Sequence, residues 1–323
     1  MKKFNVICTT LAAAGLLAAG SAHASLTAFQ QYVGTYGYSS DGFGSTTQTG
    51  TISASVPAGS TVLAAYLYTS THFGFAGAGG TFNGNTVSYT ALGATGGLEA
   101  GRADVTSIVK PIIDGGIGGV YDFTVTETSS AQDGEALVVV YSHPSLGIST
   151  IGILDGFSVQ AGDTTAINFA TPLNPAAPGF QAELALGIGF SCCDQKSTVE
   201  VNGVTMTENA GNNDDGVGST SNGQLITVGG FDDPFSPNNP IYTEDHERYN
   251  LVPYITAGDT TIQIDTKNPS FDDNIFLAVV QVTGKGGVNQ PPPDTQVPEP
   301  GSLALVGLAL AGLSGLRRKA KRG

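Results

Sequence analysis

Short apolar runs separated by turn residues dominate residues 25–284 of this 323-residue chain. The runs are rich in Val, Ile, Tyr and Thr, which favour strands, and Gly, Asn and Asp cluster between them. The Asn-Gly pairs at 83–84 and 202–203 predict hairpin turns, because both residues of such a turn take positive φ. The clearest runs are residues 61–69, 120–126, 136–141, 183–190, 260–265 and 275–282. We therefore expect an all-β body, with a short helix near 103–112 that Pro111 limits.

The pattern of the body occurs twice. An apolar strand leads to an Asn-Gly hairpin in residues 61–90 and again in 181–208. Further on, Asp-Gly at 133–134 precedes one apolar strand as Asp-Asn at 273–274 precedes another, 140 residues later. The match lies in the pattern more than in identity, and we interpret it as a duplication. It predicts two tandem β-sandwiches of jelly-roll type, the second carrying a long loop at residues 209–240.

Charge is distributed unevenly along the chain. Residues 25–296 hold 26 of the 27 acidic residues but only six of the 13 basic residues, so their formal net charge is −20. Phosphate backbones repel a body this acidic, which argues against nucleic acid as a partner. Divalent cations and neutral or cationic polymers are compatible with it.

The N-terminus has the three parts of a secretory signal peptide. Lys2 and Lys3 supply positive charge, residues 11–20 form a short apolar run, and small residues stand at Ala22 and Ala24. Cleavage by signal peptidase is expected after Ala24. The alternative, a membrane anchor, needs a longer apolar run than this one.

The C-terminus combines a proline-rich linker at residues 287–296, an apolar run at 302–316 and a basic end at 317–322. As a helix the apolar run is about 22 Å long, which is short for a ~30 Å hydrocarbon core, although flanking basic side chains can snorkel. It predicts a transmembrane helix. The basic end places the C-terminus in the cytoplasm and the body outside.

Val297-Pro298-Glu299-Pro300 stands between the linker and the apolar run. This motif, the short helix and the basic end together resemble the PEP-CTERM sorting signal. The resemblance covers the tail alone. It implies a Gram-negative bacterium that makes exopolysaccharide, and an exosortase that recognises Pro298, Glu299 and Pro300 and removes the tail. The alternative is an ordinary C-terminal anchor, and in both cases the body lies outside the cytoplasmic membrane.

Carboxylates are the richest reactive groups of the body. Adjacent pairs at 214–215, 232–233 and 272–273 bring together the hard oxygen ligands that suit Ca²⁺, although none fits an EF-hand loop. Calcium is the one cofactor that the sequence suggests. The candidate ligands are Asp214, Asp215, Asp272 and Asp273. A glycosidase needs two carboxyl groups ~5–9.5 Å apart, and the spacing singles out no such pair.

Cys192 and Cys193 are the only cysteines of the mature body, because Cys8 belongs to the signal peptide. Adjacent side chains on a strand point to opposite faces. A vicinal disulfide, two free thiols and a bridge between molecules all remain open. We favour the vicinal disulfide, which an oxidising compartment permits.

Histidines and aromatic residues are weaker candidates. His72, His143 and His246 show no metal-ligand spacing, and His246 lies in the densest polar stretch, residues 244–247. Four aromatic rings near the N-terminus suit a sugar platform, but their spacing also fits a strand that packs one face inward, which we favour. They are Tyr32, Tyr36, Tyr38 and Phe43.

The sequence therefore predicts an exported surface or matrix protein that is non-enzymatic and binds or adheres within exopolysaccharide or biofilm. It would be anchored in the inner membrane before processing and then reach the cell surface or medium. A secreted carbohydrate-active enzyme with paired carboxylates is the second hypothesis, and a calcium-stabilised structural module is the third. The predicted segments are a signal peptide at 1–24, β-sandwiches at 25–147 and 148–286, a linker at 287–296 and the sorting signal at 297–323.

Overall fold

The computed structural model describes ten stretches of the chain between residues 26 and 292. All the elements given below lie in these stretches, and the strands form four antiparallel sheets, which confirms the all-β class. The described stretches are residues 26–44, 47–72, 78–95, 97–158, 160–189, 197–211, 226–237, 239, 246–269 and 274–292.

The first half of the chain contributes two sheets, which we name by their place in the molecule. The first outer sheet has the order β3 (Thr49–Val56), β9 (Gly119–Glu127), β5 (Gly80–Phe82), β6 (Asn85–Val87). The first inner sheet has the order β2 (Tyr36–Gly44), β10 (Gln132–Ser142), β4 (Thr61–His72), β8 (Leu98–Asp104), β7 (Thr90–Thr95).

The second half contributes the other two sheets. The second inner sheet has the order β1 (Thr27–Gly34), β11 (Ser149–Asp155), β19 (Asn274–Thr283), β13 (Ala182–Gly189), β16 (Ile226–Val228), and β17 (Arg248–Asn250) also pairs with β13. The second outer sheet has the order β15 (Val204–Ala210), β14 (Ser197–Val201), β18 (Thr261–Lys267), β12 (Asp163–Phe169), β20 (Gly286–Val288).

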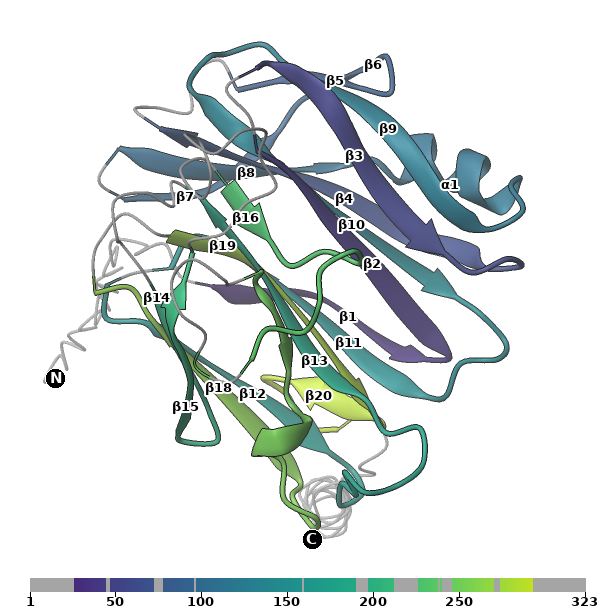
Figure 1. The fold of residues 1–323 in the computed structure, drawn as a ribbon, viewed down its shortest axis with the longest axis vertical. Coiled ribbons are helices and arrows are strands. Elements are labelled where there is room, and N and C mark those ends of the chain that lie inside the picture. The colour runs from purple at the N-terminus through teal and green to yellow at the C-terminus, as the bar shows by residue number, and fades with distance from the viewer. Residues whose placement is uncertain are drawn as a thin grey trace, which may run out of the picture.

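The four sheets stack as layers with a hydrophobic core in each of the three gaps. In Figure 1 the first outer sheet lies at the top of the stack and the second outer sheet at the bottom. One core joins the outer and inner sheets of each half, and a third joins the two inner sheets. The inner sheets are therefore buried on both faces.

Burial on both faces explains why the inner strands have continuous apolar runs. In β10, Leu137 and Val139 face the core of the first half, whereas Val138 and Val140 face the core between the inner sheets. Successive side chains on a strand point to opposite faces, so a strand with two apolar faces shows no alternation. The run IFLAVVQV of β19 has the same cause, since its residues divide between two cores.

The chain runs through one strand order twice. The inner order β2-β10-β4-β8 and the outer order β3-β9-β5-β6 of the first half recur as β11-β19-β13-β17 and β12-β18-β14-β15 in the second. Both predicted Asn-Gly turns are confirmed: Asn83 and Asn202 have φ of 48° and 52° and connect the equivalent pairs β5–β6 and β14–β15.

Sheet membership crosses the boundary between the two halves. Strand β1 lies in the range predicted for the first sandwich, yet it pairs with β11 from Thr27–Asp155 to Gly34–Ser149. Conversely, the backbone N–H of Phe231 donates to Ser40 O of β2. The predicted loop at 209–240 also differs from the structure, because β16 interrupts it and pairs with β13.

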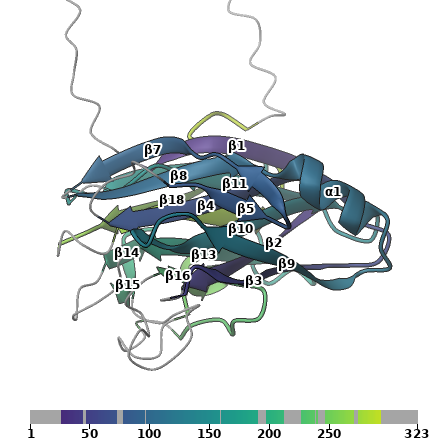
Figure 2. The same ribbon diagram turned by 90° about the horizontal axis from the view of Figure 1, so that it is seen from above.

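The two halves differ most in the segment before β9 and β18. The first half has the helix α1 (Thr106–Asp114), which continues past Pro111 to Asp114, beyond the predicted end at residue 112. It packs Val109 and Ile113 into the core of the first half and lies at the right-hand edge of the sheets in Figure 2. The second half has only the 3-10 turn η1 (Val252–Tyr254). No helix in the described stretches is long and apolar enough to cross a membrane.

Candidate functional site

Four sets of site residues predicted from the sequence lie outside the described stretches, and their roles stay predictions. The signal cleavage residues are Ala22 and Ala24, and the cysteine pair is Cys192 and Cys193. The predicted calcium ligands are Asp214, Asp215, Asp272 and Asp273. The sorting motif is Val297, Pro298, Glu299 and Pro300, and the predicted transmembrane helix follows it.

Within the described stretches, the most unusual polar group is a set of three buried carboxyl side chains, Glu127, Asp133 and Glu135, which we call the carboxyl cluster. Glu127 ends β9, while Asp133 and Glu135 lie at the start of β10. Their exposed fractions are only 5%, 1% and 1%. One oxygen of each has no hydrogen-bond partner among the described residues. Buried carboxyl groups are rare without a partner, because desolvation penalises their charge.

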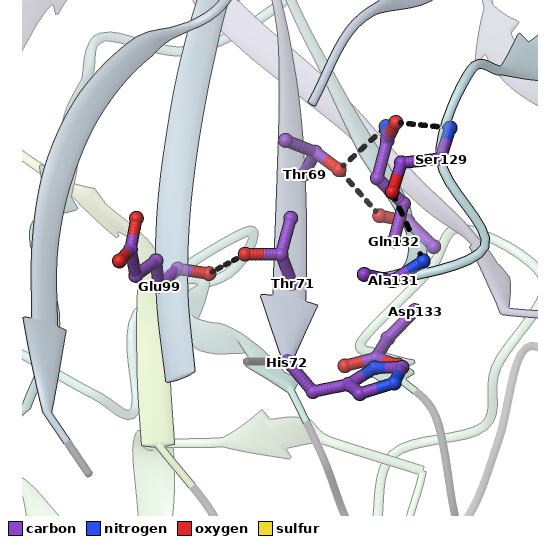
Figure 3. A network of polar contacts seen from close by, with 9 residues as sticks. Thr69, Thr71, His72, Glu99, Ser129, Ala131, Gln132 and Asp133 are labelled. Atoms are coloured by element: carbon purple, nitrogen blue, oxygen red, sulfur yellow. Dashed lines mark hydrogen bonds and ion pairs between the residues drawn. The ribbon is translucent and has the colours of Figure 1, made fainter. Parts of the chain in front are cut away.

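Gln132 organises the surroundings of the carboxyl cluster (Figure 3). Its amide nitrogen donates to Thr69 Oγ1 and to Glu135 Oε1, each at 3.3 Å. Its amide oxygen accepts from the backbone N–H of Ser129 at 3.3 Å and of Gly79 at 3.2 Å. The amide therefore links the β9–β10 connection to β4.

Burial raises the pKa of all three carboxyl groups. The pKa of Asp133 rises to about 7, because its desolvation outweighs the opposing effect of His72. Glu127 and Glu135 are hydrogen-bonded to each other, and burial raises the pKa of both. The charge of Glu135 raises the pKa of Glu127 further, so this pair holds a proton at neutral pH.

His72 contacts the carboxyl cluster through Asp133. Its Nδ1 lies 2.8 Å from Asp133 Oδ1, and Figure 3 shows the imidazole beside that carboxyl group at the end of β4. Its side chain is 28% exposed, in contrast to 1% for Asp133. The pair therefore connects the buried carboxyl group to a side chain that reaches solvent.

Burial distinguishes the carboxyl cluster from a glycosidase site. The two carboxyl groups of a glycosidase lie on either side of the sugar and must be open to it, whereas these three side chains are at most 5% exposed. The described residues also contain no group of three or more His, Cys, Asp or Glu side chains arranged to hold a metal ion. The arrangement is that of a buried, proton-holding network.

At the equivalent connection of the second half, two neutral amides meet among the described residues. Asn268, after β18, donates from its amide nitrogen to Asn274 Oδ1 at the start of β19, at 2.8 Å, and both residues are buried. Asp272 and Asp273, between them in the chain, lie outside the described stretches. The sequence analysis missed Glu127, Asp133 and Glu135. The available signal was two acidic residues placed directly before the apolar run of β10.

The other predicted histidines and acidic residues are dispersed. His246 Nδ1 lies 3.4 Å from Asp233 Oδ1, and burial raises the pKa of Asp233 to about 6. Next to it, Arg248 pairs with Glu183 at 3.1 Å. His143 is half-buried directly after β10, and its Nε2 lies 3.0 Å from the carbonyl oxygen of Ala58.

The aromatic rings near the N-terminus pack inward, as favoured from their spacing. Tyr32, Tyr36 and Tyr38 pack against the core between the two inner sheets, and Phe43 belongs to the core of the first half. Tyr32 is also hydrogen-bonded to Tyr66 through their hydroxyl groups at 3.0 Å. These rings are therefore part of the cores and form no open sugar platform.

Comparisons with known proteins bear mainly on the tail. No curated protein matches the chain. One solved structure, BpGH86A, a beta-porphyranase of glycoside hydrolase family 86 from the human gut bacterium Bacteroides plebeius, aligns at 9% identity over 82% of this chain and 37% of that chain. Its TM-score of 0.18 is too low to carry an argument. Residues 296–319 match the family described as the PEP-CTERM protein-sorting motif, so the chain carries the sorting signal of an exported protein that an exosortase processes.

Proposed function

We propose that this protein is a non-catalytic component of the cell surface or extracellular matrix, where it binds or adheres to exopolysaccharide after its tail is removed. The observation that carries the proposal is the sorting motif at residues 296–319. The described body supports it in two ways. Its four-layer β stack has both inner sheets buried, and its carboxyl cluster is buried and hydrogen-bonded rather than open to a polymer.

We further infer that each half of the body is a jelly roll. Eight strands of each half divide into two four-stranded sheets with the orders given above. If the strands of the first half are lettered along the chain from B (β2) to I (β10), with β7 left out, the inner order reads B-I-D-G and the outer order C-H-E-F. That is the arrangement of a double Greek key. Extracellular binding modules use this architecture, which supports a binding role without naming the ligand.

Processing of the tail gives the first test. In a strain that exports the protein, we expect the intact mass of the mature form to lack both residues 1–24 and the segment that follows the sorting motif. Replacing Glu299 by Ala should leave signal cleavage unchanged but cause the precursor, with its tail, to accumulate in the membrane fraction. Glu208→Ala, outside the tail, is the control. Normal removal of the tail in the Glu299→Ala strain would contradict exosortase sorting.

The matrix role is tested in the same strain. Deleting the protein should change aggregation or biofilm texture, and the wild-type chain should restore it, whereas the Glu299→Ala chain should not. Unchanged behaviour of the deletion strain would count against the role. The purified body should bind polysaccharide without releasing products, and turnover would favour the carbohydrate-active enzyme instead.

Calcium binding by Asp214, Asp215, Asp272 and Asp273 is a separate proposal, supported by the oxygen-rich composition of those segments. If a site forms, Ca²⁺ in excess of its Kd stabilises the folded state by mass action, by about 2.7 kcal/mol at a hundredfold excess. We expect the melting temperature to rise with Ca²⁺ and to fall again with EGTA. Asp214→Asn combined with Asp215→Asn should remove the response. A melting temperature that EGTA does not change would contradict the proposed calcium binding.

A further inference from the structure

A hollow of about 530 Å³ opens on the second half, beside the Asn202-Gly203 turn and η1. Its size falls within the range of sites for small ligands, roughly 300–1,000 Å³. All its lining residues lie in the described stretches. They include Asn202, Pro253, Tyr254, Thr256, Asp259 and Thr261.

The walls of the hollow are held in place by hydrogen bonds to the backbone. The amide nitrogen of Asn202 donates to the carbonyl oxygen of Tyr254 at 2.9 Å, and its amide oxygen accepts from the N–H of Gln263 at 2.9 Å. Across the hollow, Asp259 Oδ2 accepts from the N–H of Thr256 at 2.7 Å. A site that is already ordered loses little conformational entropy when a ligand binds.

Comparison of the two halves indicates why the hollow is found here. The connection between β8 and β9, residues 105–118, contains the nine-residue helix α1, which buries Val109 and Ile113. The equivalent connection between β17 and β18, residues 251–260, contains only the three-residue η1, in which no residue is buried. Without a helix there, Pro253 and Tyr254 line the hollow, and Tyr254 also packs against the core of the second half.

The lining chemistry suits a sugar. Tyr254 supplies an aromatic ring and Pro253 an apolar ring, both of which can pack against the C–H face of a sugar. Side chains with hydroxyl, amide and carboxylate groups supply hydrogen bonding beside them.

The charge of the residues that line the hollow favours a neutral sugar over an anionic one. Asp259 is the one charged residue among those lining the hollow, and no Lys or Arg lines it. The surrounding body has a formal net charge of −20 over residues 25–296. Anionic polymers such as uronates would be repelled, since no cation is present there to compensate.

We propose that this hollow is a saccharide-binding site that takes a neutral sugar unit of an extracellular polymer. The proposal rests on the proposed function and adds a location and a ligand class to it. Binding at Tyr254 and Asp259 would connect the exported body to the polysaccharide around it, while the folded core of the second half holds the site in shape.

The two Asn-Gly turns provide a matched pair of variants. Asn202→Ala removes the two side-chain hydrogen bonds that shape the hollow, whereas Asn83→Ala alters the equivalent turn of the first half, away from it. The two positions have φ of 52° and 48°, so the backbone cost of Ala is the same at both. Val204→Arg, at an exposed position of the lining, places a bulky charge in the hollow without touching a core.

The test uses the full secreted body with maltotriose, cellotriose and chitotriose as neutral probes, followed by NMR titration or calorimetry. We expect saturable binding of at least one probe by the wild-type protein and by Asn83→Ala. Asn202→Ala and Val204→Arg should weaken it at least roughly tenfold, a loss of about 1.4 kcal/mol. No binding of any probe, or equal binding by all four proteins, overturns the site.

The biofilm assay separates this proposal from the broader one. If the deletion strain is altered and the Val204→Arg strain behaves as wild type, the hollow is not the binding site but the matrix role stands. If both strains behave as wild type, the matrix role is wrong. The binding of the three sugar probes then tests the saccharide site independently of that role.

Discussion

Replacing Arg102 by Met is expected to lower the free energy of unfolding by about 3–5 kcal/mol, the cost of removing one partner of a buried ion pair. Arg102 lies on β8 of the first inner sheet, and its guanidinium contacts Asp155 on β11 of the second inner sheet. The side chain of Asp155 is only 6% exposed and also accepts a hydrogen bond from Tyr68 Oη at 3.2 Å. Without Arg102, a buried carboxylate between the sheets loses its countercharge.

Arg102 contributes packing as well as charge. Its guanidinium carbon lies 3.3 Å from the centroid of the Phe29 ring on β1, a cation–π contact. Met retains apolar bulk but loses both polar interactions. Denaturant unfolding at neutral pH measures the effect, and the melting temperature should fall by roughly 10 °C for a body of this size.

A surface pair provides the control for Arg102. Lys267 and Glu200 lie 3.7 Å apart with side chains 56% and 32% exposed, so Lys267→Met should change the free energy of unfolding by less than about 1 kcal/mol. The double variant Arg102→Met with Asp155→Asn should recover much of the loss, because no charge is then left unpaired. If Arg102→Met and Lys267→Met have equal effects, the ion pair between the inner sheets is not stabilising.

Replacing Glu127 by Gln is expected to stabilise the protein at pH 9 on the order of a few kcal/mol and to flatten its dependence on pH. Glu127 is 5% exposed, and burial followed by the charge of Glu135 raises its pKa. Gln has nearly the same shape and never ionises. The desolvation cost of a buried charge therefore disappears at the pH where that cost is largest.

Proton binding determines the direction in which pH changes the free energy of unfolding. The folded state of the wild-type protein holds protons on Glu127, Asp133 and Glu135 that the unfolded state releases above its carboxyl pKa of about 4. The free energy of unfolding is therefore largest at acidic pH and falls as the pH rises through the pKa values of the folded state. The pKa of Asp133 in the folded state is about 7, and burial raises the pKa of Glu127 and of Glu135 as well. Wild-type stability should decline from pH 5 to pH 9.

Unfolding by urea at pH 5, 7 and 9 measures this decline. Glu200→Gln, in which the altered side chain is 32% exposed, should keep the wild-type slope, whereas Glu127→Gln should reduce it. Equal stability of the wild-type protein at pH 5 and pH 9 would mean that the carboxyl cluster does not hold its protons as described.

Among the described residues, the carboxyl cluster of the first half contains groups whose pKa burial raises strongly, whereas in the second half burial raises the pKa of Asp233 to about 6. Asn268 and Asn274, between β18 and β19, form a neutral amide pair that does not titrate in this range. We therefore expect loosening at high pH to begin near the β9–β10 connection. The proposed sugar site, on the second half, should keep its affinity under conditions that weaken the carboxyl cluster.

The amino-acid sequence was sufficient to predict the all-β class, the two hairpin turns and the sorting tail. Each depends on residues close together in the chain: the Asn-Gly pairs at 83–84 and 202–203, the apolar runs, and the motif at 297–300. Local backbone preference and a contiguous recognition motif need no knowledge of distant contacts. The inward packing of the aromatic residues near the N-terminus also followed from their spacing.

Three features became visible only in the folded chain: the stacking of the halves into four layers, the pairing of β1 with the second half, and the joint burial of Glu127, Asp133 and Glu135. The continuous apolar run of β10 indicates that both faces of the strand are buried, but it does not say which sheets cover them, so it does not fix the number of layers. The carboxyl cluster also brings together side chains from the end of one strand and the start of the next in a buried place. Burial, and with it the raised pKa, depends on what packs around a residue, which no local pattern encodes.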